Sequence, residues 1–98
     1  MPANAPLAIG DDMTIYQAPE QKARLLGALA ATDSLELDLA RVGAIDSAGL
    51  QLLLLVKREA AAAGKTLRIV AHSPAVRETI EFANLAARFG DPLVISAH

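Results

Sequence analysis

Residues 35–50 read LELDLARVGAIDSAGL, and this stretch decides the fold of the chain. Its first six residues, 35–40, alternate in a two-residue period, which is typical of a strand with one buried face. From Leu50 onward the sequence is almost entirely apolar up to Val56, and it stays rich in helix-forming residues until Gly64. The sequence therefore predicts a strand, a short loop and a helix that opens at Asp46 and Ser47.

The start of this helix carries residues suited to a helix N-terminus. A side-chain oxygen of Asp46 or Ser47 can accept a hydrogen bond from an unpaired backbone N–H of the first turn. Gly49 is unusual inside a helix, since glycine costs about 1 kcal/mol relative to alanine there. We therefore predict that a neighbouring strand or a partner approaches the backbone closely at Gly49. A phosphate on Ser47 would add a charge of roughly −1.5 to −2 where the helix dipole favours an anion.

The predicted helix contains more leucine than one buried face requires. One stripe on its helical projection is assigned to the core and consists of Gly49, Leu52, Leu53, Val56, Ala60 and Ala63. Leu50, Leu54 and Leu55 fall off this stripe, at positions where a surface helix carries polar residues. We predict an exposed apolar patch beside Ser47 that binds another protein. Burial under a loop or in a homodimer is the alternative for these leucines.

Residues 42–50, VGAIDSAGL, resemble the signature of STAS domains, which occur in bacterial anti-sigma-factor antagonists and at the ends of sulphate transporters. The resemblance extends from about residue 35 to residue 95. It implies that Ser47, directly after Asp46, is the phosphoacceptor of an anti-sigma-factor antagonist. It also implies that the partner is a kinase-type anti-sigma factor or a signalling kinase.

Ala48 departs from the pattern of many phosphorylated antagonists, which carry a second Ser or Thr at this position. The relatives with Ala there include constitutive adaptor subunits of lipid-transport ABC ATPase complexes. The resemblance therefore leaves this adaptor role open, and also a scaffold role in a chemosensory pathway. In each case the predicted partner-binding residues are Asp46, Ser47, Ala48, Gly49, Leu50 and Leu54.

The rest of the chain predicts strands and helices in alternation. Ser73 before Pro74 is typical of a helix start, and Gly64 of a helix end. The expected strands are residues 7–9, 13–18, 35–40, 66–71 and 92–96, and the expected helices are residues 19–31, 47–63, 73–85 and a further turn at 85–89. This order predicts an α/β fold in a single domain over residues 1–98, with residues 1–6 as a loose N-terminus. The STAS resemblance implies a mixed sheet of about four to five strands, with about three to four helices packed mainly on one face.

Composition excludes several function classes. The 98 residues are 53% apolar, which suffices for one compact domain. Nine basic and 11 acidic residues are interspersed and give a net charge of −2, so no basic patch is predicted to bind nucleic acid. The longest nearly apolar run, residues 48–56, is too short to cross a bilayer, and the N-terminus lacks a signal-peptide pattern. The absence of cysteine fits a reducing compartment, and together these features lead us to expect a cytoplasmic protein.

Catalysis is not predicted. Acyl transfer by Ser47 would need a histidine base, and neither His72 in a loop nor the terminal His98 is a good candidate. Gly43 and Gly49 do not form a phosphate-binding loop. The adjacent acids at residues 11–12 predict a turn rather than a cation site, which needs more oxygen ligands. We therefore expect a non-enzymatic protein without cofactor or metal.

Overall fold

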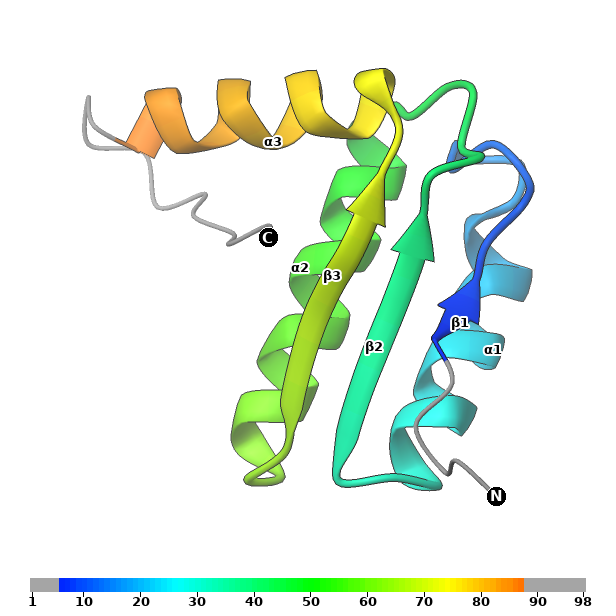
Figure 1. The fold of residues 1–98 in the computed structure, drawn as a ribbon, viewed down its shortest axis with the longest axis vertical. Coiled ribbons are helices and arrows are strands. Elements are labelled where there is room, and N and C mark those ends of the chain that lie inside the picture. Colours follow the sequence, from blue (N-terminus) through cyan, green and yellow to red (C-terminus); the bar gives the residue numbers. More distant parts are fainter. Residues whose placement is uncertain (1–5, 88–98) are drawn as a thin grey trace.

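A computed structural model describes residues 6–87 and contains three strands and three helices in strict alternation (Figure 1). The elements are β1 (Leu7–Ala8), α1 (Ala18–Ala30), β2 (Ser34–Leu39), α2 (Ser47–Ala62), β3 (Thr66–His72) and α3 (Pro74–Ala87). The strands form one sheet in the order β1-β2-β3, and both strand pairs are parallel. The α/β class is confirmed, whereas a mixed sheet of four to five strands is not. The predicted strand at residues 92–96 and nearly all of the predicted loose N-terminus lie outside the described residues.

The two crossover helices cover the same face of the sheet. Each parallel connection steps to the next strand in the same direction, and right-handed crossovers of this kind place their helices on one side. In agreement, α1 contacts both α2 and β2, while α2 contacts β3. α3 follows β3 directly; it begins at the carboxyl end of the sheet and runs outward from β3, away from β2 (Figure 1). The start of α2 lies at this same end of the sheet (Figure 1).

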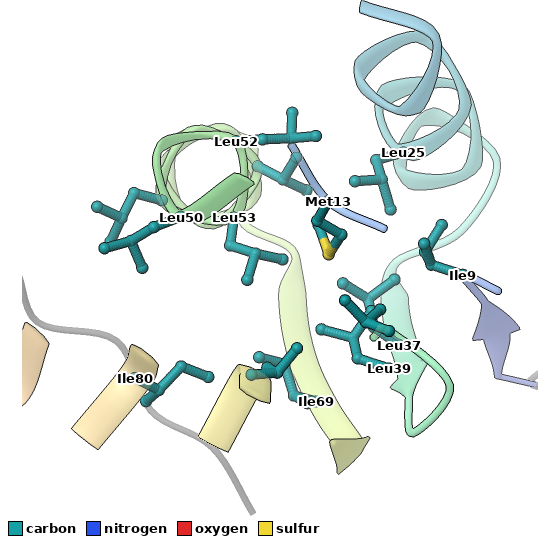
Figure 2. Packing of buried hydrophobic residues seen from close by; sticks show 14 of the residues in the cluster. Ile9, Met13, Leu25, Leu37, Leu39, Leu50, Leu52, Leu53, Ile69 and Ile80 are labelled. Atoms are coloured by element: carbon teal, nitrogen blue, oxygen red, sulfur yellow. The ribbon is translucent and has the colours of Figure 1, made fainter. Parts of the chain in front are cut away.

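The alternation of β2 separates a core face from a polar face, as predicted. Leu35, Leu37 and Leu39 are buried, whereas Glu36 and Asp38 are only half-buried. Figure 2 shows Leu37 and Leu39 of β2 in one cluster with Leu25 of α1, Leu53 of α2 and Met13 of the loop before α1. Burial of one such side chain stabilises the fold by about 1.5–3 kcal/mol.

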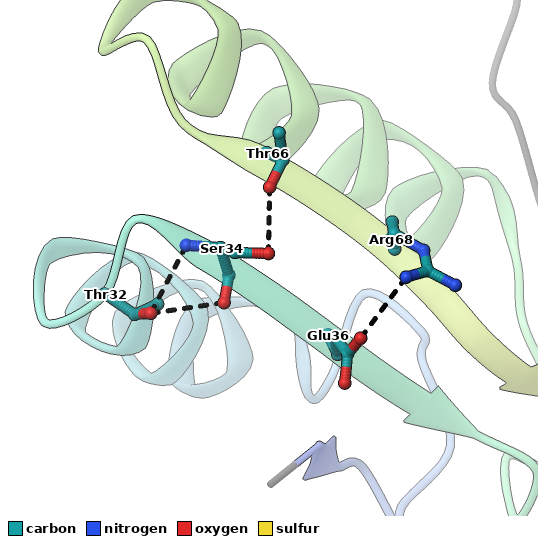
Figure 3. Close-up of polar contacts among 5 residues, drawn as sticks. All are labelled: Thr32, Ser34, Glu36, Thr66 and Arg68. Carbon is teal, nitrogen blue, oxygen red and sulfur yellow. Dashed lines mark hydrogen bonds and ion pairs between the residues drawn. The ribbon is translucent and has the colours of Figure 1, made fainter. Parts of the chain in front are cut away.

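The opposite face of β2 and β3 carries polar cross-strand pairs (Figure 3). The Thr66 hydroxyl donates to Ser34 Oγ at 2.9 Å, and Arg68 forms an ion pair with Glu36 at 3.4 Å. Both pairs follow the strand register, in which Ser34 lies beside Thr66 and Glu36 beside Arg68. This face is therefore compatible with solvent contact, unlike the leucine face.

The predicted strand at residues 13–18 is wrong. Only Met13 pairs in a strand-like manner, through a single bridge to Ile45. Beyond it the chain turns, because the backbone N–H groups of Gln17 and Ala18 both donate to the Thr14 carbonyl, at 3.1 and 3.0 Å. α1 then begins at Ala18, one residue before the predicted start. A turn thus replaces the expected second strand, which removes one strand from the predicted sheet.

Two predicted helix boundaries are confirmed and one is wrong. Ser73 Oγ accepts a hydrogen bond from Val76 N at 3.2 Å and so caps α3. Gly64 follows α2 with a φ of 70°, the left-handed conformation that glycine adopts at little cost. The predicted break at residue 85 is wrong, because α3 continues without interruption to Ala87. It thereby includes the first part of the further turn predicted at residues 85–89, and the last two residues of that turn lie outside the described residues.

Candidate functional site

Asp46 organises the start of α2. It is the N-cap residue, with an extended backbone, and its Oδ1 accepts the N–H of Gly49 at 3.1 Å. Its Oδ2 accepts a second N–H, from Ile15, at 3.1 Å. These backbone hydrogen bonds lower the pKa of the Asp46 carboxyl below its ordinary value of 3.8, and the bond from Gly49 has the largest effect. Asp46 therefore is a carboxylate at neutral pH and ties the helix start to the loop before α1.

Backbone hydrogen bonds join the loop before α1 to the loop before α2. Met13 N donates to the Ala44 carbonyl at 2.8 Å, and Asp46 N donates to the Met13 carbonyl at 3.2 Å. The side chain of Asp12 accepts Ala44 N at 3.0 Å. The buried Gln21 of α1 also contacts the loop before α1, since its side-chain amide donates to the Asp12 carbonyl at 2.9 Å. The two loops consequently form one surface.

Gly49 makes the close contact between these segments sterically feasible. A Cβ atom at this position would lie 2.1 Å from the Met13 carbonyl oxygen and 2.9 Å from Ile45 Cγ1. No side chain fits there. The close backbone approach predicted at Gly49 is confirmed, and the approaching group is the carbonyl of Met13 within the same chain.

Ser47 is the first residue of α2 and is exposed. Within residues 6–87 its hydroxyl has no hydrogen-bond partner, because Asp46 supplies the side-chain cap. The adjacent Ala48 is half-buried. Of the predicted partner-binding residues, Asp46 and Ser47 are thus exposed, Ala48 is half-buried, and Gly49 is buried.

The predicted exposed leucine patch is wrong for Leu50 and Leu54. Their side chains are only 8% and 7% exposed, and both belong to the core. Leu55 is half-buried against this core. Figure 2 places Leu50 on the side of α2 where Ile80 of α3 lies, so α2 buries a wider arc than one stripe. Conversely Ala63, assigned to the core stripe, caps the helix end and is exposed.

Apolar surface beside Ser47 comes instead from the loop before α1. Ile15 is 65% exposed and Tyr16 is 89% exposed. Asp46 holds this loop at the helix start through its hydrogen bond to Ile15 N. Sequence reasoning missed both residues as surface candidates, because it placed them in a strand.

A sequence signal for this loop was present in the spacing of Thr14 and Gln17. Ser or Thr followed three residues later by Glu or Gln is the capping-box pattern of a helix start. In the structure Thr14 N donates to Gln17 Oε1 at 3.2 Å, and the Thr14 hydroxyl donates to the same oxygen. Tyr16 N also donates to the Thr14 hydroxyl, at 3.3 Å. This local network turns the backbone and points Ile15 and Tyr16 outward.

Residues 6–87 contain no group of three or more His, Asp or Glu side chains placed to hold a metal ion. None of the helices described there combines the length and the apolar character that a bilayer crossing requires.

The fold and this helix start together define a small parallel α/β domain that presents one serine at the N-terminus of its central helix. A family model described as "Mlab, STAS domain" matches residues 2–95. The chain therefore belongs to the STAS domain family. The comparison with curated proteins found no match.

Proposed function

We propose that this protein is a non-enzymatic protein-interaction module whose partner binds the surface around Ser47 and is released when Ser47 is phosphorylated. The observation that carries the proposal is the exposed hydroxyl of Ser47 at the first residue of α2. The neighbouring Asp46 is hydrogen-bonded to Ile15 N, and Ile15 and the following Tyr16 are exposed. The likeness to anti-sigma-factor antagonists supports a kinase-type anti-sigma factor or a signalling kinase as the partner.

The helix start favours a switch that alters the surface without unfolding the domain. A phosphate on Ser47 would sit at the positive end of the α2 dipole, which favours an anion. It would also lie beside the Asp46 carboxylate, which the lowered pKa keeps ionised. The local charge would change from about −1 to roughly −2.5 to −3. A partner that covers Ile15 and Tyr16 would have to desolvate this charge, so its affinity would fall.

The test compares Ser47→Asp with Ser47→Ala in binding to the isolated partner. We expect Ser47→Ala to retain the affinity of the parent and Ser47→Asp to weaken it, while thermal unfolding shows both variants folded. Equal affinity of the Ser47→Asp protein and the parent would contradict the switch. Intact-mass measurement of the protein from its own cells then determines whether a phosphorylated fraction exists.

A constitutive adaptor is the second candidate, and Ala48 favours it. Many phosphorylated antagonists have Ser or Thr where this chain has Ala48, and the matching family model is that of the "Mlab, STAS domain" type. In this role Ser47 would contact the ATPase partner without being modified. Protein from its own cells would then show a single unmodified mass under all growth conditions.

A further inference from the structure

A shallow groove runs between the first turns of α1 and the body of α2, next to Ser47. Its apolar wall is formed by Leu52 and Leu55 of α2 and by Ile15, which is 65% exposed. Ala48 also lines the groove and is the direct neighbour of Ser47 in the chain. The groove therefore joins the exposed loop and the helix start into one continuous surface.

Two cations flank this apolar wall. Lys22 lines the groove from α1 and Arg58 lines it from α2, and both side chains are exposed. Within residues 6–87 neither takes part in an ion pair or a hydrogen bond, whereas Arg68 pairs with Glu36 and Arg77 with Glu81.

The groove is thus positive in a protein whose overall charge is negative. No carboxylate is among the groove-lining side chains in the described part of the chain, although the whole chain carries a net charge of −2. Unpaired cations on both walls of an apolar groove are complementary to a ligand that combines apolar and acidic side chains.

We infer that this groove binds an acidic amphipathic segment of the partner protein, with apolar side chains against Leu52, Leu55 and Ile15 and carboxylates near Lys22 and Arg58. The inference rests on the proposed function and gives the chemistry of the partner. It also gives a physical cause for release. A phosphate on Ser47, one residue from the groove-lining Ala48, repels the carboxylates of the bound segment.

The test begins with selection of peptides from a random 16-residue library on the immobilised full chain. We expect the selected sequences to carry Asp or Glu beside apolar residues at helical spacing. Each enriched peptide is then synthesised and titrated by fluorescence anisotropy. The double variant Lys22→Glu with Arg58→Glu should weaken binding by about tenfold, and raised salt should weaken binding to the parent protein.

The matched control is Arg41→Glu with Arg77→Glu, which changes the net charge by the same amount at exposed positions outside the groove. We expect the control to bind within about twofold of the parent. Thermal unfolding of both double variants verifies that each is folded. An equal loss in both double variants, no loss in either, or selection of peptides without acidic enrichment would overturn the inference.

Two further measurements separate this inference from the proposed switch and from self-association. Ser47→Asp is titrated with the same peptides: if it binds them as the parent does while the groove variant does not, the groove is supported and the switch fails. If Ser47→Asp weakens binding but the groove variant does not, the groove inference fails and the switch stands. Sedimentation of the parent and the groove variant completes the test, since a dimer that the groove variant abolishes would make a second copy the occupant and overturn the inference.

Discussion

Replacement of Gly49 by alanine tests the contact between α2 and the loop before α1. The added methyl group would lie 2.1 Å from the Met13 carbonyl oxygen and 2.9 Å from its carbon. Contacts of a Cβ atom below 3.0 Å essentially do not occur, so the Met13 carbonyl must move by about 1 Å. Because this carbonyl belongs to the backbone, it cannot move without moving the loop.

The expected cost follows from three contributions. Overpacking of this kind costs about 1–3 kcal/mol. Displacement of Met13 weakens its two backbone hydrogen bonds, to Ala44 and from Asp46, each worth about 0.5–1.5 kcal/mol. Alanine returns up to about 1 kcal/mol of helix propensity. We therefore expect Gly49→Ala to lower the free energy of unfolding by about 3 kcal/mol and the Tm by roughly 12–24 °C.

The assay is urea unfolding, with Gly27→Ala as the matched control. Gly27 is an exposed glycine inside α1, and a Cβ atom there would meet nothing within 4 Å. The same substitution should therefore stabilise the protein at Gly27 by about 0.5–1 kcal/mol. If Gly49→Ala is as stable as the parent or as Gly27→Ala, the steric explanation of Gly49 is refuted.

Three other predictions test the remaining features of the site. The pKa of Asp46 is lowered, so its ionised form stabilises the fold above pH 3.8, and this contribution is lost as the pH falls through the lowered pKa. When the pH is reduced from about 6 to about 3, the free energy of unfolding measured in urea should therefore fall less for Asp46→Asn than for the parent. Identical losses would contradict the capping role. Leu54→Ala should lower the free energy of unfolding by about 2–5 kcal/mol, since Leu54 is buried. A change below about 0.5 kcal/mol is typical of a surface position and would contradict the burial of Leu54. Replacing both Ile15 and Tyr16 by serine should change thermal stability little but weaken partner binding, and unchanged binding would exclude this loop from the interface.

Features that depend on neighbouring residues in the chain were predictable from the sequence. The two-residue alternation of β2 placed Leu35, Leu37 and Leu39 on the buried face, because successive side chains of a strand point to opposite faces. Ser73 and Gly64 act as helix boundaries through local hydrogen bonds and local backbone conformation. The propensity cost of glycine inside a helix likewise indicated a close contact at Gly49, although it did not identify the group that makes this contact.

The tertiary structure alone decided which leucines of α2 are buried and what lies beside Ser47. Periodicity along one helix cannot show that Leu50 and Leu54 are covered, because their burial depends on how widely the rest of the fold surrounds α2. The loop with Ile15 and Tyr16 is held beside the start of α2 by two hydrogen bonds. Ile15 N donates to Asp46, 31 positions later in the sequence, and Ala44 N donates to Asp12, 32 positions earlier. Residue types in the sequence therefore determined the strand, the helix and the exposed serine, whereas contacts between distant segments decided which apolar side chains remain at the surface.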